Sequence, residues 1–366
     1  MIRSIKVSLG NATQRKTASV AALLREYRSA TNFYIDSLWI ERGDLNAATL
    51  NRLTGGCLGY RQKSDALAMA LETVIATKKA AKATGRPCSK PHLTGAFRVS
   101  SLCAKIEPFK KEGFDYAIKL SGLVRGKPIV VPVKSHARLN YWLSKPGAKI
   151  KSGCVLHEKY AALYVEIPDE PEKVIGKDLG VDTGYRKLLA TSDGDFHGTQ
   201  MREVCARVRR TKPGSKGKRR AQATRKQYIN KAVKSLPWND LRMIAVEDLT
   251  GLKLRTQQKD TSSKKTRKTM APWTYRQALT RIEQLAQEHR VRLVYVDPRN
   301  TSRRCPACGW VAKENRVAEN FRCVRCHHSA DADTVGAVNI LARATGNWQE
   351  SMVPASSKVR RLNVAV

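Results

Sequence analysis

The sequence is poor in acidic residues and has no long apolar run. Asp and Glu total 31 against 68 Lys and Arg in 366 residues, which gives a formal net charge of +37. Such an excess of positive charge repels itself unless a polyanion neutralises it, and nucleic acid can do so along an extended surface. The net charge indicates a binding partner but says nothing about a reaction. On charge alone, a protein that merely coats nucleic acid is therefore the more ordinary interpretation.

Other features that the sequence lacks bear on location. No segment approaches the length of a membrane span, and residues Met1 to Lys16 contain no apolar stretch typical of a signal peptide. Four of the nine cysteines form two C-x-x-C pairs, and the other five are scattered: Cys57, Cys88, Cys103, Cys154 and Cys205. This usage indicates a reducing compartment and a metal site in place of a disulfide framework. We expect a cytoplasmic protein without a membrane partner.

The length suits two or three domains, and the N-terminal half is predicted to be a small β-barrel interrupted by helices. The first residues alternate as a strand, whereas apolar residues from Thr17 onward recur every three or four positions, as in a long helix. Ser64 is typical of the cap of a second helix, so residues 15–95 are interpreted as a helical insertion. Short β-prone segments follow at 115–123, 128–134, 147–156 and 160–168. Residues 1–14 and 96–170 are assigned to the barrel.

An α/β domain is predicted after a linker at residues 168–173. Strand, hairpin, helix, strand, helix and strand follow one another, which suits a layered α/β fold. The predicted strands are Leu179–Asp182, Lys187–Thr191, Leu241–Val246 and Val291–Val296, and the predicted helix before the last of them is Trp273–His289. We assign residues 174–300 and 329–345 to this domain, 301–328 to a zinc ribbon and 346–366 to a C-terminal tail.

Three acidic residues stand where predicted elements begin or end. Asp182 lies in the run Gly180-Val-Asp-Thr-Gly184, Glu247 ends an apolar strand, and Asp333 opens a helix. Three carboxylates at one edge of a sheet can hold two hard cations about 4 Å apart, one to activate water and one to steady the leaving oxygen. Phosphodiester cleavage needs such help because negative charge develops on the phosphoryl oxygens.

An acidic residue at a strand end is more often a turn or cap residue than a metal ligand. We interpret Asp193, Asp195 and Asp248 in that ordinary way. Asp331 is an alternative to Asp333, because it lies two residues earlier at the same helix start. The order and spacing of the three carboxylates carry the prediction, since none of them would do so alone.

The four paired cysteines predict a structural zinc site. Cys305 and Cys308 are followed, after fourteen residues, by Cys323 and Cys326, which is the spacing of a four-thiolate zinc ribbon. Each pair forms a tight knuckle, and four thiolates leave no open position on the metal for water. The adjacent His327 and His328 could replace Cys326 but are interpreted as surface or nucleic-acid contacts.

Two basic segments lie between the predicted catalytic elements. The first runs from Arg207 to Lys226 and is interrupted by Pro213-Gly214-Ser215, and the second runs from Lys253 to Lys268. Both could be solvated arms. Their place in the chain also suits a path for a nucleic-acid strand that enters the site. Exposed aromatic residues could stack on bases, but Tyr34 is expected to pack in the core.

The ordered set of motifs resembles TnpB, the nuclease of bacterial insertion sequences, and the related compact type V CRISPR effectors. The resemblance covers about residues 174–342. It is carried by Gly180-Val-Asp-Thr-Gly184, Val246-Glu-Asp-Leu-Thr-Gly251, Trp273-Thr-Tyr-Arg-Gln-Ala-Leu279, Val296-Asp-Pro-Arg-Asn-Thr-Ser302 leading into Cys305-Pro-Ala-Cys308-Gly309, and Ala332-Asp-Thr-Val-Gly-Ala-Val-Asn-Ile340. Val335-Gly336 departs from the Asn-Ala that the family usually has there, and the spacing from Asp182 to Glu247 is short.

The resemblance implies an α+β multidomain protein and its activity. It implies a wedge-like β-barrel with a helical recognition lobe, followed by an RNase H-like RuvC domain whose catalytic residues are Asp182, Glu247 and Asp333. It also implies two Mg²⁺ ions, a guide RNA, double-stranded target DNA beside a short flanking motif, and a location at the prokaryotic nucleoid. An unguided RuvC-like nuclease or recombinase, and a non-cleaving nucleic-acid-binding protein, stay open as alternatives, as does the choice between monomer and homodimer.

Overall fold

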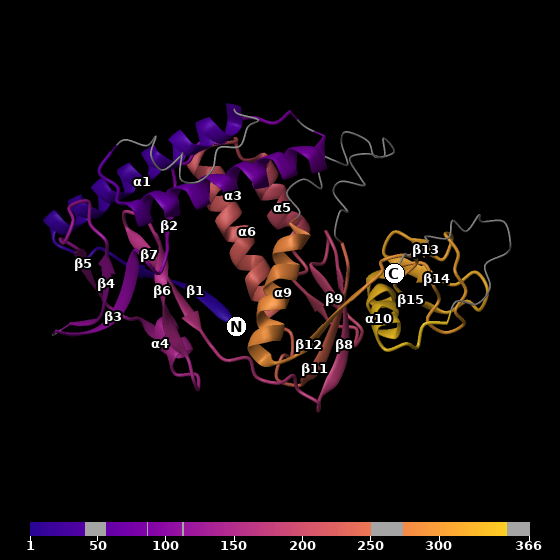
Figure 1. Ribbon diagram of the computed structural model, residues 1–366. Coiled ribbons are helices and arrows are strands. Elements are labelled where there is room, and N and C mark those ends of the chain that lie inside the picture. Colours follow the sequence, from indigo (N-terminus) through magenta and orange to yellow (C-terminus); the bar gives the residue numbers. More distant parts are fainter. Residues whose placement is uncertain (41–55, 86, 112, 250–273, 350–366) are drawn as a thin grey trace, which may run out of the picture. The chain divides into compact units, whose positions relative to one another are not determined.

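The computed structural model describes residues 1–40, 56–85, 87–111, 113–249 and 274–349. The chain divides into two compact units, Met1–Asp169 and Glu170–Val366 (Figure 1). The boundary falls inside the linker predicted from composition. Within the described ranges, no helix has the length and apolar character that crossing a membrane requires. The basic run from Lys253 to Lys268 and the tail from residue 350 onward lie outside the described residues.

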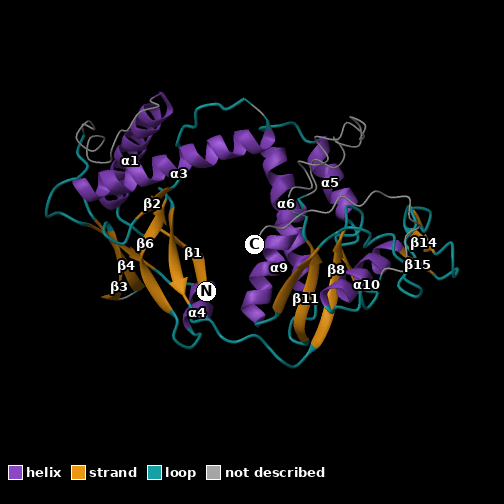
Figure 2. Ribbon diagram, turned by 45° about the vertical axis from the view of Figure 1, so that its right-hand side comes forward, coloured by secondary structure: helices purple, strands orange, loops and turns teal. Residues whose placement is uncertain are grey.

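Two antiparallel sheets form the framework of the first unit (Figure 2). The four-stranded sheet has the order β1-β7-β6-β2 and the three-stranded sheet the order β3-β4-β5. Their strands are β1 (Ile2–Ser8), β2 (Phe97–Val99), β3 (Ala104–Lys111), β4 (Phe114–Leu120), β5 (Ile129–Val133), β6 (Lys149–Leu156) and β7 (Tyr160–Glu166). β1 pairs with β7 along its whole length, so the N-terminal strand joins the later strands across the helical insertion. β3 also lies close to β6, and closure of the two sheets into a barrel stays a prediction.

Two long helices, α1 (Gln14–Ile40) and α3 (Tyr60–Thr84), pack against each other in the first unit, and a short helix, α4 (Ala137–Leu143), precedes β6. Tyr34 is fully buried, which confirms its predicted place in the core. The predicted cap at Ser64 is wrong. The cap of α3 is Gly59, five residues earlier, because the Gln62 side chain accepts a hydrogen bond from the Gly59 N–H and stabilises the helix start there.

A five-stranded mixed sheet with the order β10-β9-β8-β11-β12 forms the centre of the second unit. Its strands are β8 (Lys177–Thr183), β9 (Leu189–Thr191), β10 (Phe196–His197), β11 (Leu241–Glu247) and β12 (Arg292–Val296). β8, β11 and β12 are parallel neighbours, whereas β8, β9 and β10 pair antiparallel. The turn around Gly194 connects β9 to β10, as its Asp-Gly sequence predicts.

Helices cover both faces of this sheet, as the alternation of β11 shows. Ile244 and Val246 join a core with Ile282 of α9 (Tyr275–His289), whereas Ala245 packs with Ile340 of α10 (Ala332–Ala344). Successive side chains of a strand point to opposite faces, so α9 and α10 lie on opposite sides of the sheet. The predicted basic segment forms parts of two helices, α5 (Met201–Arg210) and α6 (Lys216–Lys234).

A small three-stranded sheet lies between β12 and α10 in the sequence. Its order is β13-β14-β15, with β13 (Arg316–Val317), β14 (Asn320–Arg322) and β15 (Ser329–Asp331). Cys305 and Cys308 precede β13, and Cys323 and Cys326 lie between β14 and β15. The buried core here consists of Cys305, Phe321, Cys323, Ala332 and Val335. Two residues of that core belong to α10, so the cysteine-bearing segment packs directly on the helix that carries Asp333.

Candidate active site and four-cysteine cluster

Asp182 and Glu247 lie on the same face of the central sheet. Gly180 of β8 pairs with Ala245 of β11, and both residues face α10. Two residues further along each strand come Asp182 and Glu247, which therefore point to the same side. Because β8 and β11 are parallel, the two carboxylates emerge together at the carboxyl ends of neighbouring strands.

Asp333 completes the group from the first turn of α10. This helix packs across β8 and β11, and its N-terminal end lies over the carboxyl ends of those strands. Asp182, Glu247 and Asp333 line one pocket of about 510 Å³, together with Thr301 and Arg316. The structure thus brings together the three acidic residues that the sequence singles out, although 151 positions separate the first from the last.

Two glycines allow α10 to lie close enough to β8 for this arrangement. A Cβ on Gly180 would lie 2.1 Å from the Ala337 carbonyl oxygen, so only glycine permits the helix backbone to approach the strand there. A Cβ on Gly336 would lie 2.9 Å from Oδ2 of Asp182. Gly336, where the sequence departs from the usual family motif, therefore makes room for the Asp182 carboxylate.

Replacement of Gly180 by alanine is expected to destabilise the second unit by more than about 3 kcal/mol, because a methyl group cannot share space with the Ala337 carbonyl without moving α10. Chemical denaturation measures the loss. Gly217→Ala in α6 is the matched control, since its Cβ would meet only ordinary contacts and alanine favours the helix. Equal stability of the two variants would contradict the close packing of α10 on β8.

Two side chains from other elements fix the carboxylates. Arg316 of β13 donates a hydrogen bond to Oδ1 of Asp333 over 2.9 Å. The Thr301 hydroxyl donates to Oε1 of Glu247 over 2.6 Å. The loop between β12 and the first cysteine pair and the small sheet thus both reach into the pocket.

The carboxylates repel one another in a poorly solvated place. Burial raises the pKa of Asp182 to about 8, and the negative charges of Glu247 and Asp333 add to the rise. Burial also raises the pKa of Glu247, and Thr301 and Arg316 offset only part of that effect. Both shifts mean that the folded protein disfavours ionisation of this group of acids without an additional positive charge.

The donor set of the pocket fits hard divalent cations. Asp182, Glu247 and Asp333 share the pocket with one guanidinium, Arg316, which is paired with Asp333, and the second arginine of the pocket wall, Arg186, is paired with Glu319. Carboxylate oxygens are the ligands that Mg²⁺ prefers, and a bound cation would supply the missing positive charge. Asp182, Glu247 and Asp333 are the residues that could hold it.

Asp331, the alternative to Asp333, and the three acidic residues interpreted as turn or cap residues do not line the pocket. Oδ1 of Asp331 accepts hydrogen bonds from the backbone N–H groups of Asp333 and Thr334, so Asp331 is the N-cap of α10, and Oδ2 pairs with Lys187. Burial opposes ionisation of Asp331, but these donors hold its pKa below the ordinary value. Asp331 does not line the pocket, and neither do Asp193, Asp195 and Asp248. Their positions agree with the assignment of Asp333, and not Asp331, to the site.

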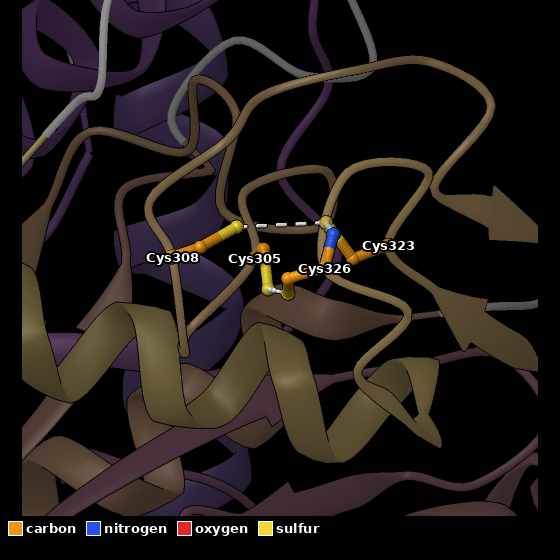
Figure 3. Close-up of side chains that lie close together, drawn as sticks. All are labelled: Cys305, Cys308, Cys323 and Cys326. Atoms are coloured by element: carbon orange, nitrogen blue, oxygen red, sulfur yellow. Dashed lines mark hydrogen bonds between the residues drawn. The ribbon is translucent and has the colours of Figure 1, made fainter.

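The four paired cysteines converge on one point (Figure 3). All four sulfurs lie within 4.8 Å of one another, and the pairs Cys305–Cys326 and Cys308–Cys323 are each 3.6 Å apart. A tetrahedron with Zn–S bonds of about 2.3 Å has sulfurs about 3.8 Å apart, so the cluster fits a zinc ion. The cluster includes Cys326 itself and neither neighbouring histidine.

Backbone groups favour the thiolate form of Cys323, whereas burial raises the pKa values of Cys305 and Cys308. The N–H groups of Arg325 and Cys326 both donate to the Cys323 sulfur, as in a tight knuckle. Burial opposes ionisation of Cys323, but these donors lower its pKa to about 7. Both donors come from the second C-x-x-C pair itself, so the short spacing shapes the ligand as well as supplying it.

Sequence reasoning did not single out Thr301 or Arg316. Thr301 lies within a run that matches the family, but nothing in the run says that its hydroxyl meets Glu247. Arg316 is one of 68 basic residues and lies 17 positions before Asp333. The only available signal was its place between the two cysteine pairs, which the fold turns toward the pocket.

Known proteins match parts of the chain. Residues 275–340 match the family described as Cas12f1-like, TNB domain. InsQ of Escherichia coli (strain K12), which its name presents as a proposed RNA-guided DNA endonuclease, is 31% identical over 196 residues, 45% of this chain and 48% of that protein. The CRISPR-associated endodeoxyribonuclease Cas12f1 of Syntrophomonas palmitatica is 27% identical over 192 residues, 44% of this chain and 37% of that protein. The chain thus spans less than half the length of these relatives.

The resemblance to the TnpB and compact type V effector family is confirmed. Solved structures extend the similarity in fold over most of the chain. The structure of a Cas12f1–sgRNA–target DNA complex matches 90% of this chain and 83% of its own with a TM-score of 0.51 at 16% identity. The structure of the mini-RNA-guided endonuclease CRISPR-Cas_phi3 matches 94% of this chain and 92% of its own, with a TM-score of 0.52 at 11% identity. The chain therefore has a mixed α/β fold similar to those of compact type V effectors.

Proposed function

We propose that this chain is an RNA-guided DNA endonuclease. A guide RNA would pair with one strand of double-stranded DNA, and the protein would check a short flanking motif and the shape of the heteroduplex. One observation carries the proposal: Asp182, Glu247 and Asp333 converge on a single pocket from three separate elements. The names of the relatives, an RNA-guided DNA endonuclease and a CRISPR-associated endodeoxyribonuclease, agree with it.

The finer architecture belongs to the same proposal. A RuvC-like nuclease domain is assigned to residues 174–300 and 329–345, and the strand order of the central sheet supports this assignment. A structural zinc ribbon is assigned to residues 301–328, and the cysteine geometry supports it. A wedge-like barrel of residues 1–14 and 96–170, with a helical recognition lobe between them, is consistent with the two antiparallel sheets and two long helices of the first unit.

The residues of the pocket have distinct roles in this reaction. Asp182, Glu247 and Asp333 would hold two Mg²⁺ ions, which supply an activated water and charge stabilisation for the leaving oxygen. Thr301 fixes the direction of one Glu247 oxygen through its hydrogen bond. Arg316 holds Asp333 and places a positive guanidinium beside the site, where negative charge develops on the phosphate.

Exposed basic side chains of α5 and α6 offer a path for nucleic acid. Among the basic residues predicted to track a strand, Lys218 bonds the Val208 carbonyl and Arg225 is half-buried, so these two are not free for a strand. The exposed members are Arg207, Arg209, Arg210, Lys212, Lys216, Arg219, Arg220 and Lys226. They belong to the same unit as the carboxylates, as a surface guiding a strand to the pocket requires.

Sequencing the RNA that copurifies with the full chain tests the proposal. We expect one recurring scaffold joined to a variable end, and DNA that matches this end should be cut by the purified complex with Mg²⁺. Cleavage that does not depend on a matching RNA would identify an unguided nuclease. Absence of both a recurring RNA and cleavage would favour a non-cleaving nucleic-acid-binding protein, and either result would overturn the proposal.

A further inference from the structure

The loop of residues 297–304, here called the Thr301 loop, connects β12 to the first cysteine pair. Thr301 is 2% exposed and donates its hydroxyl hydrogen to Glu247, which is the last residue of β11. The backbone N–H groups of Arg303 and Arg304 both bond the carbonyl of Asn300, which has a left-handed φ of 63°. The position of the Thr301 hydroxyl therefore depends on how this turn is held.

Asn339 of α10 fixes the turn through three hydrogen bonds. Its side-chain Nδ2 donates to the carbonyl oxygens of Thr301 and Arg304, both over 2.7 Å. Its Oδ1 accepts a hydrogen bond from the Arg304 guanidinium over 3.0 Å. Asn339 is fully buried, and both donors and the acceptor of its amide thus bind the Thr301 loop.

The same helix holds the beginning of the loop through a second residue. Arg343 donates to the Asp297 carbonyl oxygen over 2.6 Å. Arg304, which Asn339 binds, immediately precedes the metal-binding Cys305 and also donates to the Gln349 carbonyl oxygen. Asn339 is therefore the buried point at which α10, the Thr301 loop and the start of the cysteine cluster meet.

A buried amide with all its bonds directed at one loop is suited to a positioning role. Each bond fixes a backbone carbonyl or a guanidinium that would be costly to leave unpaired in the interior. The residue one step outside a metal ligand determines which way the ligand points, and its loss typically weakens metal binding. Thr301 stands in that relation to Glu247, and Asn339 determines the place of Thr301.

We propose that Asn339 is a positioning residue for the carboxylate site, acting on Glu247 through Thr301. Without it the turn shifts, the Thr301 hydroxyl leaves Glu247, and the carboxylate no longer points steadily into the pocket. The identity of the bound cation rests on the proposed function, whereas the chain of contacts from Asn339 to Glu247 does not.

The test measures Mn²⁺ binding directly in the full chain after high salt has removed its RNA. The electron paramagnetic resonance signal of free Mn²⁺ gives the affinity, and Asp182→Asn defines binding outside the site. Thr301→Val and Asn339→Asp are expected to weaken the Asp182-dependent affinity by about 10- to 100-fold. Thr301→Ser should restore it, because serine keeps the hydroxyl. The Thr301→Val/Asn339→Asp double variant should bind Mn²⁺ no more weakly than the single variant with the lower affinity. Both substitutions remove the same hydrogen bond to Glu247, so their effects should not add.

Gln62→Glu is the matched control. Gln62 is also a buried amide, whose Nε2 donates to the carbonyl oxygens of Ser121 and Gly122 and whose Oε1 accepts from the Gly59 N–H; all of these belong to the first unit, whereas the Thr301 loop belongs to the second. This variant should lower the unfolding temperature, keep its zinc and bind Mn²⁺ as the wild type does. If Asn339→Asp does not fold, Asn339→Ser carries the same prediction: the shorter side chain loses the direct bonds that fix the turn, while a water can satisfy the buried carbonyls and let the chain fold.

The possible results separate the inference from the proposed function. Wild-type affinity in Asn339→Asp or Thr301→Val, equal weakening by Gln62→Glu, or fully additive effects in the double variant would each overturn the positioning role alone. A wild type without Asp182-dependent Mn²⁺ binding and without cleavage would overturn the proposed function and the inference with it.

Discussion

Replacement of Asp182 by asparagine is expected to abolish DNA cleavage and, at the same time, to stabilise the metal-free protein. Burial is the main cause of the raised pKa of Asp182, and the negative charges of Glu247 and Asp333 raise it further. A bound cation lowers the barrier by several kcal/mol, and the loss of about 4 kcal/mol corresponds to a rate roughly a thousandfold lower. Single-turnover cleavage of a matched DNA measures the first effect.

The stabilising effect of Asp182→Asn depends on pH. The folded protein holds a proton on Asp182 up to about pH 8, whereas the unfolded chain releases it near the ordinary carboxyl value of about 3.9. The folded state thus binds more protons between these values, so the wild type loses stability as pH rises through this window. Asparagine does not titrate. Its advantage in unfolding temperature should therefore grow from pH 4 to pH 8 when a chelator is present.

Asp193→Asn is the control for both effects. Asp193 is an exposed carboxylate in the turn between β9 and β10 and does not line the pocket. The variant should cleave like the wild type and show no stabilisation that grows with pH. If Asp182→Asn still cut DNA at the wild-type rate, Asp182 would not belong to the catalytic site.

Loss of the cysteine cluster is expected to have the second-largest effect. In Cys323→Ser the tetrahedral donor set is broken, and structural zinc commonly contributes about 10–16 kcal/mol to the folding of small modules. Residues 303–331 would lose their fold, which removes Arg316 from Asp333 and frees one end of the Thr301 loop. We expect cleavage to fall by about 100-fold or more without recovery at high Mg²⁺, because the missing contacts lie outside the carboxylates.

Metal analysis of the purified protein measures the cause of that loss. The wild type should contain one zinc per chain, and Cys323→Ser should contain much less. Cys88→Ser, which changes an exposed thiol outside the cluster, should keep both zinc and activity. A zinc-free Cys323→Ser protein with wild-type cleavage would contradict the role given to this segment in holding the pocket together.

The strands of the central sheet could be predicted from the sequence because they have strong local signals, whereas β13, β14 and β15 were not anticipated. The apolar run before Glu247 gives β11, and the Asp-Gly pair at residues 193–194 gives the β9–β10 turn. The first unit was harder. The strands β2 and β3 and the helix α4 were not anticipated, because short elements carry little periodicity. The start of α3 depends on a contact between Gln62 and Gly59, and Gly59 is not a residue that usually indicates a helix cap by its side chain.

Only those residues of the candidate site whose type and spacing indicate their chemistry could be predicted from the sequence. Carboxylates at strand ends and paired cysteines are recognisable by type and spacing, and the structure brings each set together. Thr301, Arg316 and Asn339 are ordinary residues whose importance comes from packing. Their contacts with Glu247, Asp333 and the Thr301 loop join segments 17 to 54 positions apart, and no local pattern encodes such distances.

A crystal structure with Mn²⁺ tests the central claim most directly, because anomalous scattering locates the ions without reference to activity. The account predicts ions in contact with Asp182, Glu247 and Asp333, and a separate zinc signal between the four cysteines. Mn²⁺ bound elsewhere, with these three carboxylates making no contact to an ion, would contradict it.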